Sequence, residues 1–344
     1  MRHASQIRRL FLALVALSAF RPAIADDAPP KSAPKVGARL ARDGDEIVVC
    51  GQLYHTGTPV VTWMDPGGFD AYRVDRRFVP VERAGWKETA KEKALESPAR
   101  YGSRRAAMEP AAFERTRADG WDLPTLQGVV DQFVIHYDVA GTSRRCFETL
   151  HDKRGLSVHF MLDLDGTIYQ TLDLKDAGFH ATIANSRSVG IEIANAGAHA
   201  DPGALDRWYA RGADGKVALQ IQNRKDNEGY RDPSVLPLRP IRDELIVGRV
   251  QDQSLNQYDL TPQQYAALIK LTATLCTLLP RITCDYPRDP SGTLIPRKLA
   301  PDSYKAYHGI LGHYHVQLNK TDPGPAFQWD KVIEGARVLL KPAP

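Results

Sequence analysis

Apolar and polar positions follow a regular pattern from about residue 125 onward, and this pattern predicts alternating strands and helices. The stretch GVVDQFVIHYD (128–138) is largely apolar, which is typical of a buried strand, and SRRCFETLHDKRG (143–155) is predicted to form a helix. The next stretch, SVHFMLDLDGTIYQTLD (157–173), has two apolar arms around Asp165-Gly166, a favoured turn pair, and predicts a β-hairpin.

The C-terminal half continues this alternation. SVGIEIANAG (188–197) predicts a short strand, and residues 261–280 predict a helix in which Thr261 and Gln264 form a capping box. Two further segments complete the pattern, a strand at YHGILGHYHV (307–316) and a helix at DKVIEGARVLL (330–340). Strands that alternate with helices indicate an α/β fold with a central mixed β-sheet flanked by helices.

Two regions depart from this order. Residues 198–257 are polar and predict a long inserted loop region, of the kind that is often functional in compact domains. Residues 38–110 combine short β-rich runs with Gly, Pro and a charged stretch. About seventy such residues would form only a marginal core alone. We therefore expect them to be an accessory segment that packs on the main domain at 111–344.

The N-terminus has the three parts of a secretory signal peptide. A basic start is followed by eleven apolar residues, LFLALVALSAF, and by the small-residue site AIA that ends at Ala25. Eleven apolar residues are too few to cross a bilayer. We expect residues 1–25 to be removed, the mature chain to begin near Asp26 with a flexible leader at 26–37, and the protein to be periplasmic or secreted.

Removal of the signal peptide changes the charge of the chain. That segment carries four arginines and no acidic residue, so the net charge of +4 falls to zero in the mature chain. The basic balance therefore gives no reason to expect nucleic-acid binding. We expect a monomer without a membrane span after cleavage.

The four cysteines have no close C-x-x-C spacing. In an exported protein, disulfides are the better expectation. Cys276 and Cys284 are close in sequence, and pairing them leaves Cys50 with Cys146, although three connectivities are possible.

Three residues have the chemistry of a catalytic metal site. His136 ends an apolar strand, where taken alone it is more often a structural histidine. His313 and Asp322 change this balance, because two histidines and one carboxylate leave the fourth zinc position open for water. One zinc ion held by His136, His313 and Asp322 is therefore our expectation.

Two charged residues are candidates for catalysis beside this site. Glu192 lies between isoleucines in a strand, where it could face solvent or take a proton from a metal-bound water. Lys320 could be an ordinary loop residue or a cation directed at the oxyanion of a tetrahedral intermediate.

Four further residues are weaker candidates for substrate binding. His159 lies on an arm of the predicted hairpin, and either packing or substrate contact would suit it. His180, Asn185 and Arg187 lie in the polar loop FHATIANSRS, where they could bind polar groups of a substrate.

The motifs FVIHYD, SVHFMLDLDGTIYQ, FHATIANSRSVGIEIAN and GHYHVQLNKTDPGPAFQW occur in this order. As a set they resemble the zinc-dependent N-acetylmuramoyl-L-alanine amidases of type 2, over roughly residues 125–340 apart from the insertion. The resemblance implies the fold shared with peptidoglycan recognition proteins. It also implies hydrolysis of the amide between muramic acid and L-alanine in peptidoglycan or muropeptides.

The resemblance further implies zinc ligands at His136, His313 and Asp322, and catalytic roles for Glu192 and Lys320. His315 is the alternative to His313, because residues two apart in a strand face the same side. His313 is preferred since it follows a glycine, as in the family, and since four protein ligands would exclude water.

Two other functions stay open at this point. A protein of this fold could bind muropeptides without cleaving them, or a zinc peptidase could cut within the stem peptide. The presence of all five metal-binding and catalytic candidates argues against a pure binding module.

Overall fold

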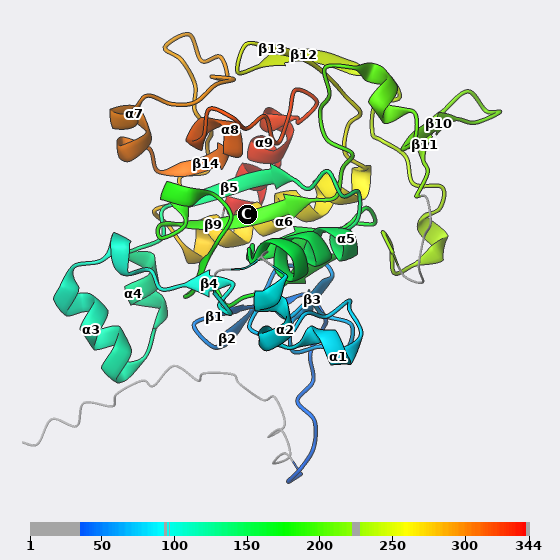
Figure 1. Cartoon of the computed structure of the whole chain (residues 1–344). Coiled ribbons are helices and arrows are strands. Elements are labelled where there is room, and N and C mark those ends of the chain that lie inside the picture. The colour runs from blue at the N-terminus through cyan, green and yellow to red at the C-terminus, as the bar shows by residue number, and fades with distance from the viewer. Residues whose placement is uncertain (1–34, 93–94, 96, 222–227, 342–344) are drawn as a thin grey trace, which may run out of the picture. The chain divides into compact units, whose positions relative to one another are not determined.

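A six-stranded mixed β-sheet is the centre of the computed structural model, which describes residues 35–341 except 93–94, 96 and 222–227 (Figure 1). The expected signal peptide and most of the expected leader lie outside these residues. In spatial order the strands are β14 (Gly309–Gly312), β5 (Gln132–Tyr137), β9 (Ser188–Ile193), β6 (Phe160–Leu162), β7 (Ile168–Gln170) and β3 (Val60–Thr62).

Parallel pairing dominates the half of the sheet that carries the candidate residues. β5 is parallel to both β14 and β9, and β9 is parallel to β6, whereas β6 and β7 form the expected antiparallel hairpin. Parallel strands need cover on both faces, which explains why β5 and β9 are apolar runs. The mixed sheet flanked by helices confirms the expected fold class.

Alternation along β5 directs neighbouring side chains to opposite faces of the sheet. Ile135 belongs to the largest hydrophobic cluster together with Leu268 and Ile333 of the two long helices, α6 (Pro262–Leu278) and α9 (Trp329–Leu340). His136, the next residue, points to the other face. That face is partly covered by α5 (Ser143–Phe147), which contributes Cys146 and Phe147 to a second cluster.

Most predicted elements are present, with local differences. The capping box of Thr261 and Gln264 is formed at the start of α6, and a π-helical turn at Glu148–Lys153 continues α5. The strand expected over 307–316 ends at Gly312, because the chain turns into a short helix, α8 (His313–Val316).

The inserted region is more ordered than the predicted loop. It contains two antiparallel hairpins, formed by β10 (Tyr209–Arg211) with β11 (Val217–Leu219) and by β12 (Ile246–Val250) with β13 (Gln253–Gln257). The remaining elements are β1 (Glu46–Val49), β2 (Gln52–His55), β4 (Tyr101–Gly102), β8 (Ala177–Gly178), α1 (Val81–Ala84), α2 (Trp86–Lys91), α3 (Pro110–Asp119), α4 (Leu123–Gln127), α7 (Pro301–Ala306) and short 3-10 turns at 105–107, 182–184, 202–205 and 233–235.

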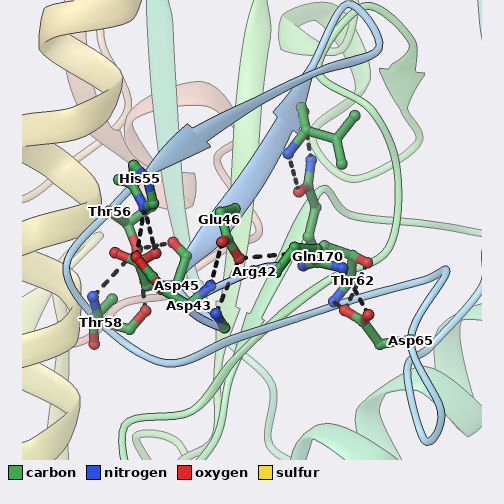
Figure 2. A network of polar contacts seen from close by, with 12 residues as sticks. Arg42, Asp43, Asp45, Glu46, His55, Thr56, Thr58, Thr62, Asp65 and Gln170 are labelled. Atoms are coloured by element: carbon green, nitrogen blue, oxygen red, sulfur yellow. Dashed lines mark hydrogen bonds and ion pairs between the residues drawn. The ribbon is translucent and has the colours of Figure 1, made fainter. Parts of the chain in front are cut away.

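The segment before residue 110 is built into the sheet. β3 pairs in parallel with β7 and forms one edge, and Ile47 and Val60 belong to the largest cluster. The Gln170 side chain accepts from the Val48 N–H at 2.7 Å and donates to the Val48 carbonyl at 2.8 Å (Figure 2). This buried amide therefore ties β1 to β7 as a neighbouring strand would.

Charged residues fix the turns that precede and follow β1–β2. The Arg42 guanidinium lies between Glu46 (3.3 Å) and Asp65 (2.7 Å), and Asp65 also accepts from the Thr62 N–H at 2.8 Å (Figure 2). Asp45 contacts His55 Nδ1 at 2.7 Å. These carboxylates are thus used by partners within the segment.

All four cysteines are free thiols in the structure. The Cys276 and Cys284 thiols contact each other, so their pairing stays a prediction. The suggested Cys50–Cys146 bond is not supported: Cys50 packs against the largest cluster, whereas Cys146 is buried in the second one. Among the described helices there is none long and apolar enough to cross a membrane.

A chain shortened to begin at Pro110 should lose solubility or melt at a lower temperature than the full chain. It would lack β3, expose the backbone edge of β7 and leave the Gln170 amide without its Val48 partners. Thermal unfolding followed by circular dichroism measures the change, with a chain beginning at Arg42 as the control. Equal melting temperatures for the two shortened chains would show that the segment contributes nothing to stability.

Candidate metal centre and catalytic pocket

Three side chains converge at the carboxyl ends of β5 and β14. His136 lies near the end of β5, His313 follows the last residue of β14, and Asp322 lies in the loop after α8. His136 Nδ1 is 2.9 Å from His313 Nδ1 and 2.9 Å from Asp322 Oδ2, and His313 Nδ1 is 3.0 Å from the same oxygen. All three residues are buried.

The loop that carries Asp322 is held from several sides. The Tyr314 N–H donates to the Asp322 carbonyl at 3.2 Å, and the Tyr137 and Thr321 hydroxyls are 2.5 Å apart. The Gln257 amide, from β13 of the inserted region, donates to the Pro323 carbonyl at 3.0 Å and accepts from the Ala326 N–H at 2.9 Å. One hairpin of the insertion therefore supports the metal-site loop.

Hydrogen bonds on the far side of each ring direct a lone pair into the cluster. Gln317 Oε1 lies 2.6 Å from His313 Nε2, so this nitrogen donates and leaves Nδ1 unprotonated. His136 Nε2 lies 3.0 Å from His180 Nδ1, and His180 Nε2 lies 3.3 Å from Ser188 Oγ. When His180 donates to Ser188, it accepts from His136 Nε2, and the Nδ1 lone pair of His136 also faces inward.

The electrostatics of the cluster fit a cation. Burial and the charge of the neighbouring His313 lower the pKa of His136 to about 4, so its ring is neutral at pH 7. Burial opposes ionisation of Asp322, but His313 and His136 hold the pKa of that carboxyl below its usual range. Two inward lone pairs beside a carboxylate oxygen repel one another unless a cation lies between them.

The spacing of the three ligand atoms also fits zinc. Atoms bound to one zinc ion at tetrahedral angles stand about 3.3 Å apart. The observed separations of 2.9–3.0 Å require each atom to move by only a few tenths of an ångström. Two imidazoles and one carboxylate leave a position for a water, as in catalytic zinc sites.

His315 is not part of this cluster. Because α8 is helical, residues 313 and 315 point in different directions, and the strand geometry that made them equivalent does not apply. His315 Nδ1 accepts from the Gly312 N–H at 2.9 Å, and its Nε2 lies 2.8 Å from the Ile295 carbonyl. Both ring nitrogens are therefore used to hold the β14–α8 turn.

Glu192 stands beside the cluster because its strand is in register with β5. In the parallel pairing of β5 and β9, His136 is opposite Glu192, so both side chains leave the same face. Burial, and then the negative charges of Asp322 and Asp138, raise the pKa of Glu192 well above its usual value. Its buried Oε2 has no partner among the described residues.

A cavity of about 270 Å³ contains these groups. Its lining includes the three cluster residues, Glu192 and His180, and also Lys320, whose positive charge partly offsets the raised pKa of Glu192. The structure thus brings together six of the nine residues expected at the site, namely His136, His180, Glu192, His313, Lys320 and Asp322.

The other three expected residues do not line this cavity, and each has structural partners. His159 is fully buried: it accepts from the Gly190 N–H at 3.1 Å, its Nε2 is 2.9 Å from the Asp176 carbonyl, and burial lowers its pKa to about 3. Asn185 Oδ1 accepts from the Ala181 N–H at 2.7 Å. Arg187 pairs with Asp131, at the amino end of β5, at 2.7 Å.

Sequence reasoning missed Asp138 and Val139, which also line the cavity. Asp138 Oδ1 accepts from the N–H groups of Ala140 and Gly141 at 3.0 and 2.9 Å, and burial raises its pKa to about 8. Val139 has φ +55°, a conformation that is strained for a β-branched residue. The only signal was the DVAG turn directly after the strand.

His180 lies against the central sheet, a position that the polar loop sequence around it did not predict. Its imidazole packs across the backbone of β9 at Gly190 and reaches His136. Burial, and then the charge of His136, lower the pKa of His180 well below its usual value. The ring is therefore a neutral partner that orients His136.

Several solved structures are similar to this chain. An endolysin N-acetylmuramoyl-L-alanine amidase from Clostridium intestinale is 16% identical over 63% of this chain and 88% of its own, with a TM-score of 0.32. An AmpD derivative is 16% identical over 72% and 93% (TM-score 0.32). The E. coli amidase AmiD, solved with an anhydro-muropeptide substrate, is 18% identical over 60% and 57% (TM-score 0.32).

No curated protein sequence matches the chain. The family profile described as N-acetylmuramoyl-L-alanine amidase, Amidase_2, matches residues 126–325, which is more than half of the 344 residues. This range contains the whole cluster, the facing Glu192 and the cavity loop with Lys320. The chain therefore belongs to the Amidase_2 family of N-acetylmuramoyl-L-alanine amidases.

Proposed function

We propose that this amidase is an exported zinc hydrolase that cleaves the bond between N-acetylmuramic acid and L-alanine in peptidoglycan or muropeptides. The observation that carries the proposal is the convergence of His136 Nδ1, His313 Nδ1 and Asp322 Oδ2, with Glu192 in register beside them. Nitrogen and carboxylate donors in this number suit zinc better than Mg²⁺ or Ca²⁺, which prefer oxygen ligands.

The metal would be held by His136, His313 and Asp322, and when bound it would polarise the amide carbonyl and lower the pKa of a bound water. Glu192 takes the proton of the attacking water and returns a proton to the leaving nitrogen of alanine. Its unpartnered oxygen supports this role because it is available to a water, and burial raises the pKa of the carboxyl, which makes the carboxylate a stronger base.

Lys320 contributes a positive charge to the same cavity as Asp322. A cation there stabilises the negative charge that develops on the carbonyl oxygen. His180 acts through His136: it holds the Nε2–H and thereby keeps the Nδ1 lone pair directed at the metal.

Glu192→Gln should retain the metal and lose most turnover. The substitution preserves shape but removes the base, and general acid–base catalysis typically contributes about 10²–10⁴-fold to the rate. Release of stem peptide from purified sacculi, followed by mass spectrometry, gives the rate and the bond that is cut. Glu334→Gln, on α9, is the matched control. A rate near that of the unchanged protein would move the base elsewhere.

His313→Ala should lose both zinc and activity, whereas His315→Gln should retain about one zinc per chain. Gln at 315 can still offer an acceptor to Gly312 and a donor to Ile295, so the turn is preserved. Metal analysis of the purified variants, with thermal unfolding as a folding check, measures the difference. A metal-free His315→Gln variant beside a loaded His313→Ala variant would reverse the ligand assignment.

The exported chain should begin near Asp26 and contain a Cys276–Cys284 disulfide, with Cys50 and Cys146 as thiols. The contact between the Cys276 and Cys284 thiols, on α6 and in the loop after it, supports this pair. Intact-mass measurement before and after reduction should show the gain of two hydrogens. Four free thiols, or a chain that still begins at Met1, would contradict this proposal.

A further inference from the structure

A second cavity, of about 350 Å³, is lined by three arginines and two aromatic rings. The arginines are Arg77, Arg144 and Arg231, and the rings belong to Phe69 and Tyr169. Among the described residues that line this cavity, none carries a carboxylate. It shares no lining residue with the catalytic pocket.

Distant parts of the sequence form this cavity. Phe69 and Arg77 come from the accessory segment, outside the residues matched by the family profile. Arg144 lies on α5, Tyr169 on β7, and Arg231 in the inserted region. The two regions that distinguish this chain from the shared core therefore each add a guanidinium to one cavity.

The positive charge of this cavity is not neutralised by ion pairs. Over the described residues, no carboxylate forms an ion pair with the side chain of Arg77, Arg144 or Arg231. Nearby acids serve other groups: Asp165 accepts from the backbone N–H of Arg231, Glu228 pairs with Arg145, and Asp152 pairs with His151. Burial, and then the charges of Arg73 and Arg144, lower the pKa of Arg77, so repulsion outweighs the attraction of Asp152 and Asp70.

Aromatic rings hold two of the guanidinium groups in place. The Arg77 guanidinium lies 5.1 Å from the Phe69 ring centroid and 5.4 Å from that of Phe78, and Arg144 lies 4.1 Å from the Phe78 centroid. Arg77 also donates to the Gly68 carbonyl. Stacking leaves donor groups at the edges of each guanidinium free and reduces the entropy lost on binding.

We propose that this three-arginine cavity binds carboxylate groups of the peptidoglycan stem peptides, as a subsite separate from the catalytic pocket. Guanidinium groups bind carboxylates in bidentate fashion, and the aromatic walls suit the apolar parts of a peptide. The inference rests on the proposed function for its substrate. A phosphate group has related chemistry and is separated from a carboxylate by the test.

The position of α5 relates this subsite to catalysis. Arg144 lines the three-arginine cavity, whereas Cys146, two residues later, lines the catalytic pocket. Side chains two residues apart on a helix point in nearly opposite directions, so the two cavities flank α5 at roughly one helix diameter, about 10 Å. A peptide of the same polymer strand can reach across that distance.

The test measures binding of the full chain to purified sacculi by co-sedimentation, so that the readout does not depend on turnover. One batch of sacculi is untreated, and in a second batch the carboxyl groups are converted to neutral amides. The Arg144→Gln/Arg231→Gln double variant should bind untreated sacculi about tenfold more weakly than the unchanged protein. It should lose little further binding on amidated sacculi, whereas the unchanged protein should lose much.

Two matched variants separate this subsite from a general effect of charge. Arg117→Gln/Arg249→Gln removes two exposed arginines elsewhere and should bind as the unchanged protein does. Arg144→Lys/Arg231→Lys keeps the charge but loses the bidentate contact and the stacking, so it should recover only part of the binding that Arg144→Gln/Arg231→Gln loses. Thermal unfolding confirms that each variant is folded.

Equal binding of the Arg144→Gln/Arg231→Gln variant and the unchanged protein would overturn the subsite. The subsite would also be overturned if the variant binds more weakly than the unchanged protein by the same factor on untreated and on amidated sacculi. Competition by inorganic phosphate at low concentration, with no effect of amidation on binding, would likewise overturn it, because the ligand would then not be a carboxylate. If the unchanged protein binds sacculi in a way that depends on Arg144 and Arg231 but does not cleave them, only the proposed hydrolysis is contradicted and the subsite stands.

Discussion

The site depends on the parallel pairing of β5 with a strand on each side. Because β14, β5 and β9 run in the same direction, their carboxyl ends meet at one edge, and the residues at those ends come together. His136, Glu192 and His313 are far apart in sequence, yet each needs only its place at or just beyond a strand end to reach the cluster. Asp322 is the exception, since a supported loop has to return it to the same edge.

The same edge also concentrates titratable groups whose pKa values are shifted by burial and by one another. The pKa of His136 is lowered so that its ring is neutral, the pKa of Asp322 is lowered so that it stays ionised, and the pKa values of Glu192 and Asp138 are raised. Opposite shifts in neighbouring carboxyl groups are typical of sites in which one carboxyl binds a charge and another moves a proton. In such a site, electrostatic interactions are stronger than in water, because the surrounding protein screens them less.

Sequence reasoning reached the strands, the hairpin, the capped helix and the six residues that share the catalytic pocket, because each had a local signal or a place in an ordered motif. The prediction that the strand continues through His315 was wrong. No local sequence signal shows that the strand ends at Gly312 and is followed by a single helical turn. Arg187 and His159 were expected to bind substrate because they are polar residues in or near a loop. Their structural partners, Asp131 and the carbonyl of Asp176, could be identified only from the folded chain. The three-arginine cavity was missed for the same reason, because Phe69 and Arg231, which both line it, are 162 positions apart in the sequence.

Gly190 influences the candidate metal site although it has no side chain. A Cβ atom built on this residue would lie 2.6 Å from two atoms of the His180 ring, which is closer than any real contact. The ring can lie across β9 only because that position is bare, and His180 in turn sets which nitrogen of His136 carries the proton. The orientation of His136, one of the proposed metal ligands, therefore depends on a position in the middle of a strand that carries no side chain, and even the single methyl group of alanine there would disturb it through His180.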